Sequence, residues 1–415
     1  MKETQMKETQ KVSQLKQKKR ILVFCVPFNG HLNVLKEMMK RYAHTFQFKL
    51  VITGWTNVSP PLSDFLGDYE IVAKEKLSET DPCLWTFPRV LTQLDTCLTI
   101  AEEFKPDLIL YDFFSLEGYF VGKKKNIPYW CSVPAMIGSF DDQKYVQEKL
   151  SSQINKNAIS EMYKKYGIDI KKEQIELISD GFHLAGQCNV IWSYEDVVES
   201  HFLRNRARSE YLFVGNPQII CKRKKETNKP LVYFSLGTVV MNNLWSQQEE
   251  TRKKLTAFID ALAKKWENKN VDVLFISRGQ KVLETYPKNW TVLPQVNQME
   301  ILSRAAVFVT HGGSNSFHES ILQKVPMVVI PFFGDQILVG KRVEQLGIGI
   351  NTCRDASIDT RRSKKFLDEN LVIRVDKAVF EILKNKKYVR RCERVTLKRT
   401  PLLKVLTHFF KKESS

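Results

Sequence analysis

The feature that most constrains this chain is a loop, residues 311–316 (His-Gly-Gly-Ser-Asn-Ser), between a strand-like run at 305–310 and a helix-like run at 317–323. Glycines let the backbone approach a ligand closely. The start of a helix presents free N–H groups and the positive end of the helix dipole. The segment therefore predicts an anion-binding turn, and a phosphorylated molecule is its expected ligand.

A second apolar run at 327–331 is followed shortly by Asp335 and Gln336. The whole segment therefore reads as one right-handed βαβ unit. Ligands gather at the carboxyl ends of parallel strands, which would bring His311 and this pair to one rim. Ser316 and Glu319 also fit a capping box, in which they would only satisfy the first turn of a helix. Taken alone, the loop leaves both interpretations open.

From Pro294 to Gly349 the chain resembles the donor-binding signature of the UDP-glycosyltransferases, especially the soluble macrolide-type members. Several fixed spacings agree at once: the Pro-Gln at 294–295, the loop at 311–316, Glu319, the Asp-Gln at 335–336 and the later glycines. The resemblance implies an α/β fold in the GT-B arrangement, with two Rossmann-like doubly wound domains facing a cleft. It covers nearly the whole chain, weakly over residues 55–105 and 135–185.

The resemblance also implies roles for the donor-binding residues. The side chains at the loop would hold the diphosphate, and a carboxylate suits the vicinal hydroxyls of ribose. The implied donor contacts are His311, Gly313, Asn315 and Ser316 for the diphosphate, Glu319 for the ribose, Gln295 for the base edge, and Asp335 and Gln336 for the sugar. A second small-residue turn, Gly237-Thr238, either contacts phosphate or is only the first turn of its domain.

Many relatives carry an aromatic residue three positions before the glutamine, to stack on uracil. Val292 stands there in this chain. Trp290 lies two residues away on the same face of a strand, so it either substitutes or is an ordinary core or surface tryptophan. The preference for uridine is open at this point.

A catalytic pair is predicted near the amino terminus. The apolar run 21–26 delivers His31 to a loop, and a neutral imidazole is suited to remove a proton from an attacking hydroxyl if its other nitrogen is oriented. Asp112 ends a second strand-like run at 108–111. Taken alone, His31 could be an ordinary polar residue of a turn, and Asp112 could be a helix cap. By resemblance, His31 is the general base and Asp112 orients it.

The chain is long enough for two domains with a core each. We expect an N-terminal acceptor-binding domain at 21–214, a linker at 215–230 and a nucleotide-sugar-binding domain at 231–395. A disordered basic segment at 1–20 and a basic helix or tail at 396–415 would flank them. Aromatic residues in the weakly matching regions could line the acceptor pocket or belong to the core: Trp55, Trp85, Phe87 and Phe140.

The net charge is +18, and residues 384–415 contribute disproportionately, with 11 basic and 2 acidic residues. A solvated charged face is the default interpretation, and contact with an anionic membrane is the alternative. The apolar and basic segment 402–412 suits a helix packed across the two domains better than interfacial membrane contact. Nucleic-acid binding is not expected, because no recognised module accompanies the charge.

No signal-peptide core and no run of about eighteen apolar residues is visible, so a cytoplasmic enzyme is expected, with peripheral contact to a membrane as the alternative. The eight scattered cysteines form no Cys-x-x-Cys pair, no Asp-x-Asp occurs and the histidines form no ligand cluster. The sequence predicts an inverting, metal-independent hexosyl transfer, with glucose expected, from a UDP-sugar to a hydroxyl of a small hydrophobic acceptor, without a separate cofactor. Two alternatives remain: a lipid or sterol glycosyltransferase at a membrane, and a non-catalytic sugar-nucleotide-binding protein.

Overall fold

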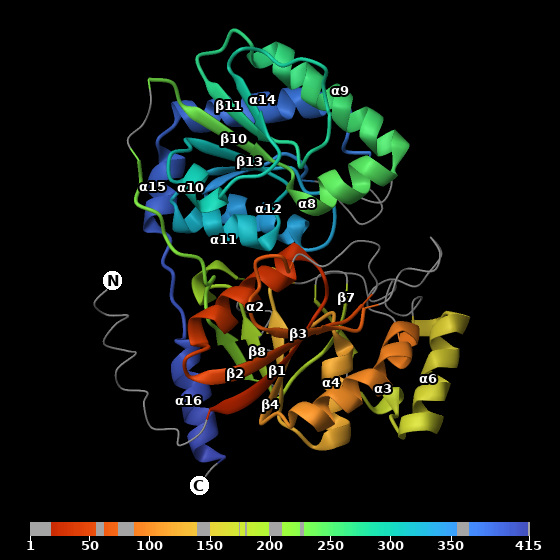
Figure 1. The fold of residues 1–415 in the computed structure, drawn as a ribbon. Helices are drawn as coiled ribbons and strands as arrows, with labels where there is room; N and C mark the ends of the chain where they lie inside the picture. Colours follow the sequence, from red (N-terminus) through yellow and green to blue (C-terminus); the bar gives the residue numbers. More distant parts are fainter. Residues whose placement is uncertain are drawn as a thin grey trace.

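Two parallel β-sheets organise the molecule. The computed structural model describes residues 18–54, 62–73, 87–138, 150–173, 175–178, 181–198, 210–224, 228–354 and 365–413. Within these residues a seven-stranded and a six-stranded sheet lie one above the other, each with its own helices (Figure 1). The expected doubly wound α/β class is confirmed.

The seven-stranded sheet has the order β3-β2-β1-β4-β5-β8-β9. Its strands are β1 (Lys19–Cys25), β2 (Phe46–Ile52), β3 (Asp68–Ile71), β4 (Leu108–Asp112), β5 (Tyr129–Val133), β8 (Cys188–Ile191) and β9 (Glu210–Phe213). The helices of this half are α2 (Asn29–Tyr42), α3 (Phe87–Phe104), α4 (Leu116–Lys125) and α6 (Gln153–Tyr166), with short 3-10 turns at Ile170–Lys172 and Glu195–Val197. A separate hairpin joins β6 (Ile175–Ile178) and β7 (Gly181–Leu184).

The six-stranded sheet has the order β12-β11-β10-β13-β14-β15. Its strands are β10 (Leu231–Ser235), β11 (Asp272–Ile276), β12 (Trp290–Leu293), β13 (Val307–Thr310), β14 (Met327–Val329) and β15 (Gly349–Asn351). The helices are α8 (Gly237–Val239), α9 (Glu249–Trp266), α10 (Gln298–Leu302), α11 (Ser314–Leu322), α12 (Gln336–Gln345), α14 (Asn370–Lys384) and α15 (Lys387–Arg394), with a π-helical turn at Val240–Trp245. The last helix of the chain is α16 (Leu402–Lys412).

Each sheet has a topological switch point, where strand order changes direction. The first lies between β1 and β4, the second between β10 and β13. The loops leaving two such strands diverge, so a crevice opens at the carboxyl edge of the sheet. His31 follows β1 and Asp112 ends β4, while Gly237 follows β10 and His311 follows β13. Both predicted halves of the site therefore lie at switch points.

Apolar side chains pack on both faces of each sheet, as expected for strands that are buried on both sides. In β1, Leu22 and Phe24 join a core with α3 and α4, whereas Ile21 and Val23 join a core with α2 and α16. The second sheet packs α9 and α14 on one face, and α10, α11 and α12 on the other. Phe87, a candidate for the acceptor pocket, is fully buried in the first core.

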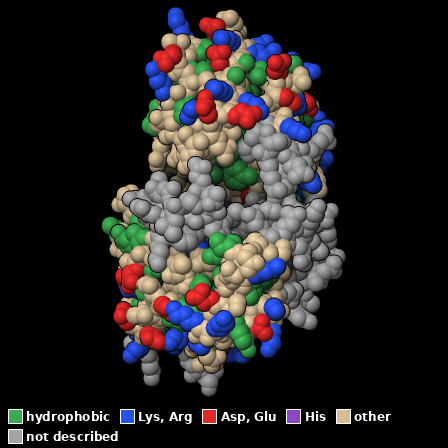
Figure 2. Space-filling model, turned by 90° about the vertical axis from the view of Figure 1, so that its right-hand side faces the viewer, with side chains coloured by type: hydrophobic (Ala, Val, Ile, Leu, Met, Phe, Trp, Pro, Cys, Tyr) green, Lys and Arg blue, Asp and Glu red, His purple; other side chains and the backbone are tan. Residues whose placement is uncertain are grey.

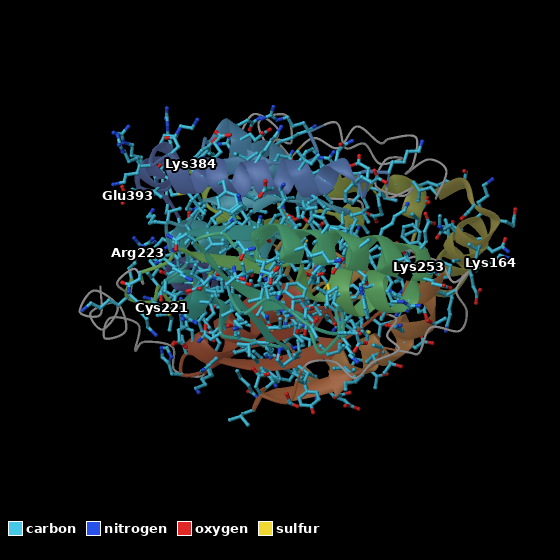
Figure 3. The ribbon with its side chains drawn as sticks, turned by 90° about the horizontal axis from the view of Figure 1, so that it is seen from above. Lys164, Cys221, Arg223, Lys253, Lys384 and Glu393 are labelled. Atoms are coloured by element: carbon cyan, nitrogen blue, oxygen red, sulfur yellow. The ribbon has the colours of Figure 1, made fainter. Side chains whose placement is uncertain are left out.

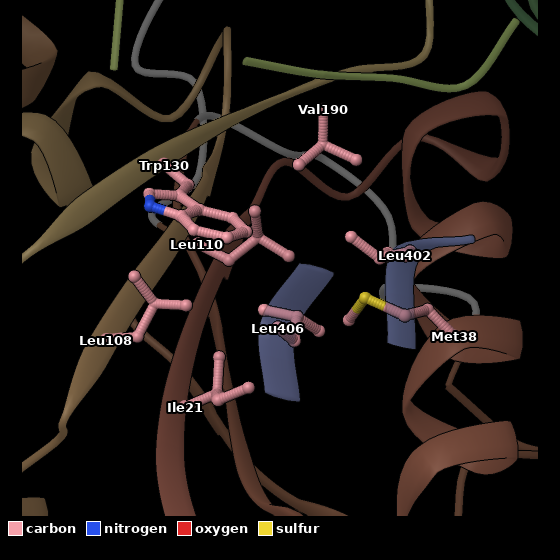
Figure 4. Close-up of a pocket in the computed structure, with 8 residues that line it drawn as sticks. All are labelled: Ile21, Met38, Leu108, Leu110, Trp130, Val190, Leu402 and Leu406. Carbon is pink, nitrogen blue, oxygen red and sulfur yellow. The ribbon is translucent and has the colours of Figure 1, made fainter. Parts of the chain in front are cut away.

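The carboxyl-terminal helix α16 returns to the first half of the molecule (Figure 1). Its residues Leu402, Leu406 and Phe410 are buried against β1, β4, β5 and α2. Only a small apolar gap remains beneath the helix, beside Trp130 and Met38 (Figure 4). The apolar stripe of the helix is thus used for packing, as the sequence favoured, but it packs against the first half and not across the two domains.

The amino-terminal boundary differs from the prediction. Strand β1 begins at Lys19 and pairs in parallel register with β2, so Lys19 and Arg20 are ordered strand residues. The Arg20 amide and the Lys19 ammonium both contact the Asp107 carboxylate, and this pairing explains why the strand extends into the basic segment. Residues 1–17 lie outside the described part, as do Trp55, Trp85 and Phe140.

Charged residues of both signs are mixed on one face of the molecule. In Figure 2, Lys and Arg side chains alternate with Asp and Glu over both halves of the face shown. Figure 3 places Lys384 and Glu393 on the same side as Cys221 and Arg223. Arg223 donates a hydrogen bond to the Gln323 carbonyl at 3.0 Å, so the linking segment is fixed on the second half. No helix of the described residues has the length and apolarity needed to cross a bilayer.

Candidate functional site

The structure brings His31 and Asp112 together at the first switch point. His31 Nδ1 lies 2.8 Å from Asp112 Oδ2, and 81 residues separate the two along the chain. The Asp112 side chain is 0% exposed and that of His31 is 16% exposed. A buried carboxylate accepts from Nδ1–H, which leaves Nε2 as the unprotonated nitrogen.

The surroundings of the pair fix its geometry. Asp112 Oδ1 accepts a hydrogen bond from the Phe114 amide at 3.0 Å, so both carboxylate oxygens have partners. The imidazole lies among three aromatic rings and stacks on Phe114, with ring centroids 5.0 Å apart. A ring held in this way can rotate little, and its environment is apolar.

Deeper in the same half, Arg89 supports the turn that carries Phe114. Its guanidinium donates to the Phe114 carbonyl at 2.7 Å and pairs with Glu117 at 3.0 Å. Arg89 and Glu117 are both 0% exposed. The turn after β4 is therefore held by a buried ion pair that the sequence analysis did not identify.

At the second switch point, two glycines enclose the His311 imidazole. A Cβ atom on Gly237 would lie 2.3 Å from the ring, and one on Gly313 would lie 2.6 Å from it. Gly237 also has a φ of +79°, which only glycine adopts readily. The turns after β10 and β13 thus close on each other around this histidine. Thr238 lies in the same turn, partly exposed, as the second residue of α8.

The His311 ring is neutral at physiological pH. Burial, together with the nearby charge of Arg278, lowers its pKa to about 4. A neutral imidazole acts on a phosphate as a hydrogen-bond donor and not as a counter-ion. Any compensation of phosphate charge must come from other groups.

Helix α11 begins at Ser314, three residues earlier than the sequence indicated, with Gly313 as its N-cap. The helix has no capping hydrogen bond from a side chain at this end. Ser316 is therefore inside the first turn, and the capping-box interpretation of Ser316 and Glu319 is wrong. The first N–H groups of the helix have no intrahelical acceptor and point toward the turn after β13.

Glu319 belongs to a hydrogen-bonded network that links β10 to α10 and α11 on one face of the second sheet. Gln298 Nε2 donates to Glu319 Oε2 at 2.6 Å and to Ser316 Oγ at 3.1 Å. The Tyr233 hydroxyl donates to Gln298 Oε1 at 3.0 Å. Burial raises the pKa of Glu319 to about 7, although the Gln298 hydrogen bond opposes that rise. A carboxylate with one protein donor retains capacity to accept from a ligand.

The predicted base-edge residue, Gln295, does not take part in this hydrogen-bonded network around Glu319. It is exposed in the turn after β12 and makes no hydrogen bond to the described residues. Gln298 is the glutamine that reaches Glu319. Its sequence signal is the N-cap Asn297, whose side chain accepts from the Glu300 amide and starts α10 at Gln298.

Trp290 is a core residue, which settles the choice left open by the sequence. It is 7% exposed and packs against Trp266, Tyr286 and Phe275. It is therefore not presented to a ligand as a stacking surface. Val292 is half-buried and packs against the same core.

The Asp335-Gln336 pair begins α12, and its two side chains have different surroundings. Asp335 Oδ2 accepts from the Met136 amide of the first half at 2.7 Å. Gln336 is buried, and its Oε1 accepts from the Phe332 and Phe333 amides. Gln336 holds the turn that presents Asp335, and its Nε2 has no partner among the described residues.

One hydrogen bond connects the two halves beside the reactive groups. Asn315 Nδ2 donates to the Gly30 carbonyl at 2.9 Å, one residue before His31. The buried His318, on the same helix, reaches Ser193 Oγ at 2.7 Å. The anion-binding turn and the His31–Asp112 pair therefore face each other across the domain boundary. Within the described residues, no three His, Cys, Asp or Glu side chains are grouped as metal ligands would be.

Comparisons with known proteins point to one family. Residues 220–360 match the family model described as UDP-glucoronosyl and UDP-glucosyl transferase. The NDP-glycosyltransferase YjiC of Bacillus subtilis is 28% identical over 67% of this chain and 68% of its own length. The uncharacterized UDP-glucosyltransferase YojK of the same organism is 26% identical over 90% of this chain and 92% of its own.

Solved structures share the fold. The glycotransferase of kitacinnamycin superposes with a TM-score of 0.64 at 18% identity, over 91% of this chain and 94% of its own. The spinosyn rhamnosyltransferase SpnG complexed with spinosyn aglycone gives a TM-score of 0.60 at 14% identity, over 90% of this chain and 94% of its own. The two sheets thus have the GT-B arrangement.

Proposed function

We propose that this chain is a UDP-glycosyltransferase of the family 1 glycosyltransferases and that it transfers a hexose, glucose in the first instance, from a UDP-sugar to a hydroxyl of a small hydrophobic acceptor. The transfer is inverting and needs no metal. His31 is its general base.

The observation that carries the proposal is the Asn315–Gly30 hydrogen bond. It joins the first turn of α11 to the residue before His31, so a sugar held at this turn lies next to the imidazole. Proximity of this kind is required for a general base, which must be within hydrogen-bond reach of the proton that it removes. Neither half of the site could perform the transfer alone.

The chemistry is a direct displacement. His31 Nε2 takes the proton of the acceptor hydroxyl, the acceptor oxygen bonds to the anomeric carbon, and the bond from that carbon to the diphosphate oxygen breaks. UDP leaves with the electron pair, and the configuration at the anomeric carbon inverts. The buried Asp112 stabilises the imidazolium that forms.

On the donor side, Glu319 accepts the ribose hydroxyls, and Gln298 takes the position near the nucleoside that the sequence gave to Gln295. His311, Gly313, Asn315 and Ser316 contact the diphosphate, and Thr238 and Gly237 close that turn. Asp335 accepts a sugar hydroxyl beside the Met136 amide, while Gln336 donates through its Nε2.

The apolar surroundings of the base support a hydrophobic acceptor. The His31 ring lies next to Phe28, Phe113 and Phe114, with centroids between 5.0 and 6.0 Å from it. Aromatic rings bind planar or polycyclic apolar molecules by burial of their faces. SpnG, which shares the fold, has been solved with an aglycone.

The test is a transfer assay with UDP-glucose, UDP-galactose, UDP-N-acetylglucosamine and TDP-glucose against planar phenols and macrolide aglycones. Wild type should form a β-glycoside from the α-linked donor, seen by NMR. His31→Ala should lose transfer and retain UDP-glucose binding by calorimetry. The matched control is His44→Ala, because His44 is exposed just beyond α2. Transfer by His31→Ala at the wild-type rate, or a retained anomeric configuration, contradicts the mechanism.

A further inference from the structure

The second half of the site contains a cation that no role above uses. Arg278 follows β11, and β11 lies next to β10 in the sheet. The residues just beyond the ends of β11, β10 and β13 are Arg278, Gly237 and His311. Because these three strands are adjacent and parallel, the three residues share the carboxyl edge at the switch point.

Arg278 is held in a conformation that an L-residue rarely adopts. Its φ is +56°, in the left-handed region, and the turn is closed by the Gln280 amide donating to the Ser277 carbonyl at 3.1 Å. This conformation costs on the order of 1 kcal/mol for a residue with a Cβ atom. Gly279, the next residue, would adopt it without cost. Lys105, Asn126 and Lys324 also have a positive φ, but among these residues only Arg278 lies at the carboxyl edge of the switch point.

The guanidinium lacks the partners that a partly buried cation normally has. Its Nε is buried without a hydrogen-bond acceptor, and no carboxylate of the described residues pairs with Arg278. Its charge acts on two groups of the donor site, the His311 imidazole and the Tyr233 hydroxyl. Tyr233 in turn bonds Gln298, the partner of Glu319. The charge of Arg278 thus acts on groups at both the diphosphate end and the ribose end of the donor site.

From this placement we propose that Arg278 binds the diphosphate of the nucleotide donor, with its guanidinium directed at the phosphate nearer the ribose. The proposal rests on the proposed function, which supplies a nucleoside diphosphate as the ligand. A guanidinium matches the geometry of phosphate oxygens in a bidentate contact. His311 is neutral, so Arg278 provides the fixed positive charge that the turn itself lacks.

The same charge acts during the reaction. When the bond between the anomeric carbon and the diphosphate oxygen breaks, the leaving diphosphate gains one negative charge. A fixed cation beside it stabilises that charge without reorganisation. Arg278 therefore contributes to the departure of UDP as well as to donor binding, and its removal lowers both the affinity for UDP and the rate of transfer.

The experiment compares UDP, UMP and uridine by calorimetry on wild type, Arg278→Gln, Arg278→Lys and the control Arg304→Gln. Arg304 is an exposed arginine just after α10. Arg278→Gln should bind UDP about 10- to 100-fold more weakly, as expected for the loss of a charge-assisted hydrogen bond, and bind uridine as wild type does. Arg278→Lys should lie between the two, and Arg304→Gln should equal wild type.

Two results overturn the inference while the proposed function stands: equal UDP affinity in wild type and Arg278→Gln, or equal weakening of UDP and uridine. If wild type binds neither UDP nor UMP, the proposed function fails, and this inference fails with it. Thermal denaturation of each variant separates a folding defect from a binding defect. Arg278→Lys keeps the comparison valid if Arg278→Gln does not fold.

Discussion

The two halves of the site differ in how far the protein itself satisfies their polar groups. In the first half, both Asp112 oxygens have donors, His31 has its carboxylate, and the deeper Arg89 is paired with Glu117. In the second half, Arg278 pairs with no carboxylate of the described residues, and Glu319 has one donor among them and a raised pKa.

This difference corresponds to the two tasks. A general base must have a fixed orientation before the acceptor arrives, and full internal pairing provides that orientation. A donor site must exchange its polar contacts with a charged ligand, so groups left short of partners favour the bound state. The first half is complete without substrate, and the second is completed by the nucleotide.

The largest expected effect is on catalysis by the first half, whose polar groups are already paired. Asp112→Asn replaces the carboxylate by an amide that can donate to Nδ1, so it favours the wrong tautomer of His31. Transfer should fall about 1,000-fold, in the range of general-base catalysis, while UDP-glucose affinity stays unchanged. The control is Asp107→Asn, just before the start of the same strand. A fall of less than tenfold in the rate constant would show that His31 needs no carboxylate.

The two buried or partly buried arginines offer a direct contrast in stability. Arg89→Met leaves Glu117 buried without its partner and should lower the free energy of unfolding by about 3–5 kcal/mol in urea denaturation. Arg89→Met combined with Glu117→Leu should recover most of that loss. Arg278→Met should change stability by less than about 1 kcal/mol, or raise it, because Arg278 has no ion-pair partner among the described residues. Equal losses of unfolding free energy in Arg89→Met and Arg278→Met would contradict the proposed difference between the two arginines.

The local motifs of the donor half could be predicted from sequence because they lie within one βαβ unit. The turn at 311–316 and its flanking elements follow from glycines and apolar periodicity. The start of α11 could not be placed, because Ser314 and Asn315 fit a loop as well as a first helical turn. Predicting the His31–Asp112 contact required a known family pattern, since 81 residues separate the pair.

Other features depend on tertiary structure and left no local signal. Trp290 lies on the same face of β12 as Val292, and only the packing of α9 behind the sheet determines that Trp290 is buried. The Arg89–Glu117 pair joins two helices whose contact the sequence does not encode locally. The contact of Asp335 with the Met136 amide depends on how the domains meet. None of these follows from spacing alone.

The affinity of the second half for the nucleotide donor should depend on pH. The charged form of Glu319 accepts the ribose hydroxyls, whereas burial raises its pKa in the free protein to about 7. At lower pH the carboxyl must release a proton to bind, so UDP-glucose affinity should be about tenfold weaker at pH 6 than at pH 8. The pKa of His311, about 4, lies outside this range. Glu319→Gln should remove the dependence, and a flat wild-type profile would contradict it.

The smallest effect distinguishes Gln298 from Gln295. Gln298→Ala removes the donor to Glu319 Oε2 and should weaken UDP-glucose binding about 3- to 10-fold at pH 8, the worth of one hydrogen bond. Because that bond lowers the pKa of Glu319, its loss should also move the midpoint of the pH profile upward. Gln295→Ala, an exposed change three residues away, should alter neither quantity. A midpoint that moves with Gln295 and not with Gln298 would restore the assignment made from the sequence and remove Gln298 from the nucleoside end of the site.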